Sequence, residues 1–231
     1  MGNTPDLSNA AYTADYLAHR NSMINTAFQP ENKIKTEESM GNGCKRVIEE
    51  YKSEQNGEYV YCARNIVFDE SGAQIHEYMN IYHHPFFCDL IKHVNGKSYL
   101  FYKEDLYGYG VYDLEEKKAF SYFPTHSWHR GETFIATNLY YNEKNNIMAA
   151  EGCYWACPSE TFLFRINDPL KIFDSHLSLH LLLDKEYDKY DDICFSGWEG
   201  TGLELKCYDI QAKPPKNIDI VLKEEDYLPF L

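Results

Sequence analysis

Apolar and polar residues alternate along this chain in short runs, and turn residues separate the runs, which is the pattern of β-strands joined by tight turns. Residues 87–123 show it most clearly, as four runs that predict one antiparallel meander. The segment 133–166 repeats the scheme, and residues 191–222 contain a further round. The apolar run 177–183 between these two rounds predicts a buried strand.

The rounds of strands close on apolar-acidic phrases that recur roughly every 45 residues, a period that is typical of β-propeller blades. The phrases are Val67-Phe68-Asp69, Val111-Tyr112-Asp113-Leu114, Phe164-Arg165-Ile166-Asn167 and Cys207-Tyr208-Asp209-Ile210. Over residues 58–222 this order of strands and turns resembles the blades of WD-repeat proteins, although the Trp-Asp and Gly-His pairs of that family are absent. The resemblance implies an all-β, β-propeller-like fold of about four or five blades. A β-sandwich or a barrel is the alternative.

The N-terminal part departs from the strand pattern. Residues 8–28 predict a helix, because apolar side chains recur near one of its faces and Pro30 follows it. Residues 30–43 are polar and predict a linker. We therefore expect an N-terminal helical appendage and linker over residues 1–43 and a single all-β repeat domain over residues 44–231.

Composition and charge narrow the classes of partner. The formal net charge is −14, which repels phosphate backbones and anionic membrane surfaces, so we expect neither nucleic acid nor a membrane as partner. No stretch approaches the ~20 apolar residues of a membrane span, and the first residues do not have the pattern of a secretory leader. Several of the seven cysteines lie within apolar strand patterns. We therefore expect free thiols in a reduced, cytoplasmic protein.

Polar and aromatic residues are densest in two segments, 125–132 and 151–157. The first precedes one strand of the third round and the second follows the next strand, and these positions lie at the same end of an antiparallel hairpin. Loops at one end of a β scaffold commonly form binding sites. The candidate ligand-binding residues are His126, Trp128, His129, Arg130, Glu132, Glu151, Cys153, Tyr154, Trp155 and Cys157.

Three chemistries suit these residue types. A zinc site would use the two cysteines with the two histidines, but Cys153 and Cys157 would lie about 13 Å apart along an extended strand, so such a site requires a tight turn between them. We expect no metal and no cofactor. A cysteine nucleophile with a histidine base would suit covalent hydrolysis. Glu132 and Glu151, close in sequence to tryptophans, would suit glycoside hydrolysis.

The sequence contains no specific catalytic motif, and whether the chain is an enzyme stays open. We favour a cytoplasmic ligand- or protein-binding module whose partner is a protein, a peptide or a small molecule. Trp128, Arg130, Tyr154 and Trp155 would supply the contacts, as aromatic and arginine side chains do at interfaces. The alternatives are a hydrolase of the glycoside or cysteine type with its site at the same loops, and a structural subunit of a larger assembly.

Overall fold

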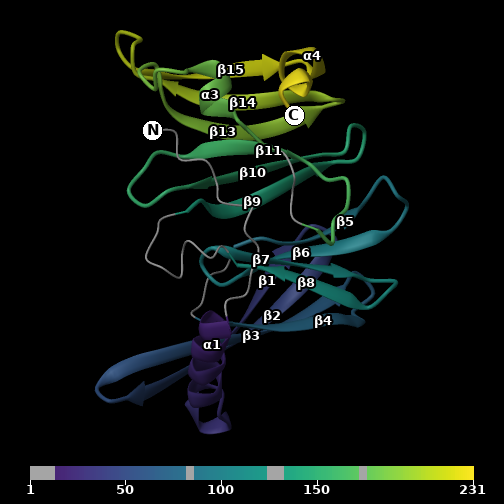
Figure 1. The fold of residues 1–231 in the computed structure, drawn as a ribbon, viewed down its shortest axis with the longest axis vertical. Coiled ribbons are helices and arrows are strands. Elements are labelled where there is room, and N and C mark those ends of the chain that lie inside the picture. The colour runs from purple at the N-terminus through teal and green to yellow at the C-terminus, as the bar shows by residue number, and fades with distance from the viewer. Residues whose placement is uncertain (1–13, 82–85, 124–132, 172–175) are drawn as a thin grey trace. The chain divides into compact units, whose positions relative to one another are not determined.

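The structure is a computed structural model that describes residues 14–81, 86–123, 133–171 and 176–231 (Figure 1). The described chain divides into two compact units. The first unit consists of α1 (Ala14–Ala27), η1 (Pro30–Asn32), β1 (Lys33–Gly41), β2 (Cys44–Gln55), β3 (Glu58–Asp69), β4 (Gln74–Ile81), β5 (Cys88–Lys92), β6 (Ser98–Glu104), β7 (Gly108–Asp113) and β8 (Lys118–Tyr122). The second unit consists of β9 (Ile135–Asn142), β10 (Ile147–Cys153), β11 (Glu160–Arg165), β12 (His176–Ser178), α3 (Leu179–Leu183), β13 (Tyr190–Glu199), β14 (Gly202–Asp209), β15 (Lys216–Leu222), α4 (Glu224–Tyr227) and η2 (Leu228–Phe230).

The strands form four antiparallel sheets in which neighbours in sequence are neighbours in space (Figure 1). β1 to β4, β5 to β8 and β9 to β12 each form a four-stranded meander, and β13 to β15 form a three-stranded one. Repeated meanders of this kind are the building blocks of all-β, propeller-like folds. The prediction of the fold class is therefore confirmed.

The recurring acidic phrases end equivalent strands and shape the turns that follow them. Asp69, Asp113 and Asp209 are the last residues of β3, β7 and β14, and Oδ1 of each accepts hydrogen bonds from two backbone N–H groups of the next turn. Such side-chain-to-backbone bonds favour a turn over further strand. The β2–β3 hairpin has a two-residue turn of a different kind. Its residues Asn56 and Gly57 both have positive φ angles, 54° and 81°, as such turns require.

Two segments differ from their predicted structure. Residues 33–41, expected within a linker, form the edge strand β1, whose side chains are mostly exposed and therefore polar in composition. The run 177–183, expected to be one buried strand, is divided between the short strand β12 and the helix α3. The Ser178 hydroxyl accepts a hydrogen bond from the Leu181 N–H (3.1 Å) and caps that helix.

The predicted N-terminal helix is present as α1, although residues 8–13 lie outside the described residues. Its C-terminal end buries Ala27 with Tyr51, Val60 and Cys62 of β2 and β3. This helix is therefore part of the first unit's core. Within the described ranges, none of the helices has the length and apolarity that crossing a membrane requires.

Candidate functional site

The predicted site residues divide into two groups. His126, Trp128, His129, Arg130 and Glu132 lie outside the described residues. Glu151, Cys153, Tyr154, Trp155 and Cys157 lie at the end of β10 and in the segment that follows it. The described site is therefore the 151–157 half of the prediction.

Residues 154–157 form a tight turn that separates a buried ring from an exposed one. The Cys157 N–H donates a hydrogen bond to the Tyr154 carbonyl (3.1 Å), and Ala156 has a φ of 55°. Tyr154 is buried, whereas 62% of the Trp155 surface is exposed. The turn thus presents an indole at the surface of the second unit.

The base of this turn lies next to the start of β9. Cys153 pairs with Ile135 in the β9–β10 ladder, and the Tyr154 ring lies 5.7 Å from the ring of Phe134. The end of β10 and the start of β9 therefore lie at one end of the sheet, as the hairpin argument predicts.

Glu151 is used as a structural acceptor in the described chain. Its Oε2 accepts the Phe195 N–H of β13 (3.0 Å), and its Oε1 accepts from the Asn138 amide (3.3 Å). β13 pairs with β14 on one side only, so the Phe195 N–H belongs to a strand edge. The carboxylate supplies the acceptor that a neighbouring strand would otherwise supply.

The turn changes the geometry that the zinc argument assumed. Cys153 and Cys157 are separated by a turn rather than by extended strand, and neither forms a disulfide. Among the residues that the structure describes, no three histidine, cysteine or acidic side chains are grouped as metal ligands would be. The two histidines of the zinc hypothesis lie outside these residues.

A second polar cluster, which the sequence reasoning missed, begins beside this turn. Glu160 is opposite Gly152 in the β10–β11 ladder and is hydrogen-bonded to the Ser178 hydroxyl. Burial raises the pKa of Glu160. His180 stacks on Tyr187, with ring centroids 5.1 Å apart, and one ring nitrogen, Nε2, bonds the Tyr190 carbonyl (3.0 Å). The cluster connects β11 to α3 and to the start of β13.

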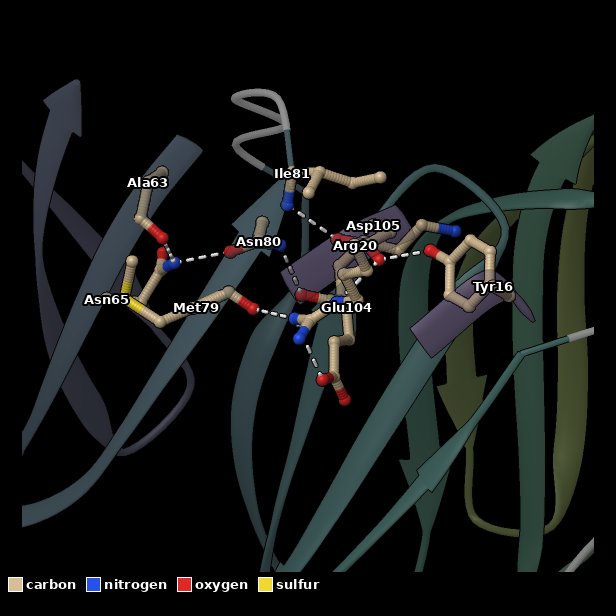
Figure 2. Close-up of polar contacts among 10 residues, drawn as sticks. Tyr16, Arg20, Ala63, Asn65, Met79, Asn80, Ile81, Glu104 and Asp105 are labelled. Carbon is tan, nitrogen blue, oxygen red and sulfur yellow. Dashed lines mark hydrogen bonds and ion pairs between the residues drawn. The ribbon is translucent and has the colours of Figure 1, made fainter. Parts of the chain in front are cut away.

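The first unit contains a buried charge network, shown in Figure 2, that the sequence reasoning also missed. Arg20 of α1 forms ion pairs with Asp105 (2.9 Å) and Glu104 (3.2 Å), and it donates to the Met79 carbonyl. Tyr16, one turn earlier on α1, donates to the same Asp105 carboxylate. These bonds attach α1 to β4 and to the end of β6.

Asp105 and Glu104 have different surroundings within this network. Asp105 has a φ of 56°, and its Oδ1 accepts the Ile81 N–H (2.8 Å) while Oδ2 accepts from Arg20 and Tyr16. Burial raises the pKa of Glu104 to about 7, because desolvation exceeds the attraction of Arg20. Burial thus opposes the charged form of the Glu104 carboxyl, and the ion pair with Arg20 favours it.

The comparisons with known proteins give likenesses of backbone alone. No protein-family model matches the sequence, and no curated protein is similar to it. The chain is similar to the GH43 endo-arabinanase from Bacillus licheniformis (TM-score 0.36, 10% identity, over 82% of this chain and 73% of that one). It is also similar to MPT-1, a GDP-Man-dependent mannosyltransferase from Leishmania mexicana (TM-score 0.34, 11% identity, 82% and 68%), and to a bifunctional GH43-CE protein from Bacteroides eggerthii (TM-score 0.34, 7% identity, 83% and 24%).

Proposed function

We propose that this chain is a binding module that holds its ligand against Trp155, and that the ligand is an uncharged or basic peptide segment of a protein partner. The observation that carries the proposal is the exposure of Trp155 (62%) on a turn whose preceding residue, Tyr154, is buried. An indole on a hydrogen-bonded turn offers a large contact area at little cost in side-chain entropy. Tryptophan is also among the residues that contribute most to binding at interfaces.

Glu151, which lies on β10 shortly before this turn, supports a binding role over a chemical one. The Glu151 carboxylate is occupied by the Phe195 N–H and the Asn138 amide, so it acts as a structural acceptor in the described chain. The net charge of −14 disfavours an anionic ligand. We further propose a reducing compartment such as the cytoplasm, which is consistent with seven cysteines that form no disulfide.

The test is a binding screen with a matched pair of variants. The wild-type chain is applied to an array of neutral and basic peptides and to an array of oligosaccharides, and each hit is titrated with wild type, Trp155→Ala and Phe230→Ala. Phe230 is the control because it is a similarly exposed aromatic residue (60%) elsewhere in the second unit. We expect Trp155→Ala to weaken peptide binding roughly tenfold or more, as loss of an interface anchor does, and Phe230→Ala to leave it unchanged.

Three results would overturn the proposal. Equal binding by wild type and Trp155→Ala would remove the turn from the contact. Binding to oligosaccharides alone would identify a sugar-binding module. Release of cleaved product from either array would favour the hydrolase alternative, of the glycoside or the cysteine type.

A further inference from the structure

The turn between β1 and β2 is bound to β5 by several hydrogen bonds within the first unit. The Leu90 N–H donates to the Asn42 carbonyl (2.8 Å), and the Asn42 N–H donates to Oδ1 of Asp89 (2.8 Å). Two cysteines lie close in sequence to the bonded residues, Cys44 at the start of β2 and Cys88 at the start of β5. The turn thus brings together two thiols that are far apart in sequence.

The two cysteines are buried and in contact. Cys44 and Cys88 are 2% and 4% exposed and belong to the same cluster of core residues. Sγ of Cys44 lies 3.1 Å from the Cys88 carbonyl oxygen, to which it donates a hydrogen bond. Each of the two thiols also shifts the pKa of the other. A sulfur held this close to the backbone of the other cysteine needs little movement to reach its sulfur.

The surroundings make one of the two thiols the more reactive. The neighbouring Cys88 thiol lowers the pKa of Cys44, whereas the Cys44 thiol and burial raise the pKa of Cys88 well above its usual range. The Arg46 guanidinium, which bonds the Tyr78 hydroxyl and the Phe86 carbonyl (both 3.0 Å), adds a positive charge that favours the thiolate of either cysteine. A thiolate near a cation is the form that oxidants attack.

We propose that Cys44 and Cys88 are a redox-active pair that closes to a reversible disulfide between β2 and β5 in the presence of a peroxide. The exposed Asn42 lies two residues before Cys44 in this turn, so the thiol pair lies close to solvent despite its burial. A small uncharged oxidant such as hydrogen peroxide suits this position. The bond would join the first two sheets of the unit covalently at the point where the turn already contacts β5.

The chemistry balances with one peroxide for each disulfide. The Cys44 thiolate attacks one oxygen of hydrogen peroxide and breaks the O–O bond, which gives a sulfenic acid and, with the proton taken up, one water. The Cys88 sulfur then attacks the Cys44 sulfur, the S–O bond breaks, and the departing hydroxide takes the Cys88 proton as a second water. The two cysteines lose two electrons, and the peroxide gains them.

The other buried cysteines provide the contrast. Burial raises the pKa of Cys62 to about 11 and that of Cys207 to about 12. Both are therefore less reactive than Cys44 towards a peroxide at neutral pH. Cys157 is exposed and is expected to react with alkylating reagents without gaining a partner in its own chain.

The experiment identifies the linked cysteines in the folded wild-type chain. The reduced protein is treated with hydrogen peroxide, the remaining thiols are alkylated, and the tryptic digest is analysed by mass spectrometry without reduction. Cleavage at lysine and arginine places Cys44 in the peptide 36–45 and Cys88 in the peptide 65–92, each with one cysteine. We expect these two peptides to be joined, with a mass lower by two hydrogen atoms than their sum, and to separate on addition of dithiothreitol.

A second measurement and a matched variant complete the test. The linked protein is expected to melt several degrees higher than the reduced protein, since the link closes a long loop. Cys62→Ala is expected to form the same link, and Cys44→Ala is expected to form none. The proposal is overturned if peroxide oxidises Cys157 while the peptides 36–45 and 65–92 stay separate. It is also overturned if the link forms only in urea, or if Cys44 pairs with another cysteine instead.

Discussion

His76 provides the sharpest prediction about stability, because its ring is enclosed by tyrosines and has no hydrogen-bond partner at Nε2. The imidazole stacks on Tyr112, with ring centroids 4.2 Å apart, and lies 5.1 Å from Tyr102 and 5.9 Å from Tyr78. Nε2 is buried and has no partner in the described chain. Burial lowers the pKa of His76 from 6.5 to about 4, since these surroundings do not solvate an imidazolium.

The sign of the pH effect follows from this lowered pKa. The unfolded chain takes up the proton of His76 below its ordinary pKa of 6.5, whereas the folded chain takes it up only near pH 4. Stability is therefore present above pH 6.5, falls as the pH drops from 6.5 to about 4, and levels off below that. At about 1.4 kcal/mol for each pKa unit, the full loss would be roughly 3 kcal/mol. Because His76 is partly exposed, we discount this to about 2 kcal/mol at pH 4.5.

The assay compares wild type with His76→Phe, which keeps an aromatic ring in the stack and removes the titration. Urea unfolding followed by circular dichroism at pH 7 and pH 4.5 gives the free energy of unfolding of each protein. Other groups titrate over the same range, but they affect both proteins equally, so the difference between the proteins isolates His76. We expect wild type to lose about 2 kcal/mol more than the variant. A difference that stays constant between the two pH values, or an NMR titration of His76 near pH 6.5, would refute the argument.

Two further predictions concern stability. Glu151→Ala should lower the free energy of unfolding by about 1–3 kcal/mol in urea unfolding, because the Phe195 N–H loses its acceptor. Glu151→Gln keeps an oxygen at this position and should cost less than about 1 kcal/mol. Equal losses for the two variants would contradict the role of Glu151 as acceptor. Arg20→Met should cost about 3–5 kcal/mol, because it leaves two buried carboxyl groups without their cation. The control Arg64→Met removes two partly exposed ion pairs, with Glu49 and Glu77, and should cost about 1 kcal/mol or less. Similar losses for both arginines would count against the buried network.

The sheets were predictable from the sequence because local signals determine their turns. Asn56-Gly57 requires positive φ angles, and the aspartates that end strands bind the backbone of the following turn, so both signals act over a few residues. The strand β1 and the helix α3 were not predictable in the same way. β1 is an exposed edge whose polar composition resembles a linker, and a short apolar run such as 177–183 suits a strand and a helix equally.

The candidate site was predictable only in part, because polar residues near one another in sequence acquire their roles from partners far along the chain. Glu151 has the residue type of an acid catalyst, but its partner is the Phe195 N–H. One feature of the sequence does indicate the buried charge network of Arg20. Arg20 lies four residues after Tyr16 on the apolar face of α1, and a charge in such a stripe indicates a buried partner.

The three-stranded sheet explains why polar groups of the chain gather along the edge of β13. In the sheets β1–β4 and β5–β8 the strand that ends on an aspartate, β3 or β7, is the third of the sheet, whereas in this sheet β14 is the second. The strand without a counterpart in the described chain is therefore the one before β13. The free edge of β13 is satisfied instead by neighbouring groups. The Ile193 N–H donates to the Ser159 carbonyl (3.0 Å), and the Ile193 carbonyl accepts from the Thr161 hydroxyl (2.9 Å).

Glu151 completes this edge, which gives its carboxylate a role in the fold. Trp155, by contrast, has most of its surface exposed to solvent. Substitutions of Glu151 and of Trp155 should therefore have different effects on stability and on binding. Glu151→Ala should lower stability and affect binding only through the fold, whereas Trp155→Ala should leave the unfolding midpoint nearly unchanged and weaken binding. If Trp155→Ala instead destabilises the chain as strongly as Glu151→Ala, the indole is part of the fold and the binding site lies elsewhere.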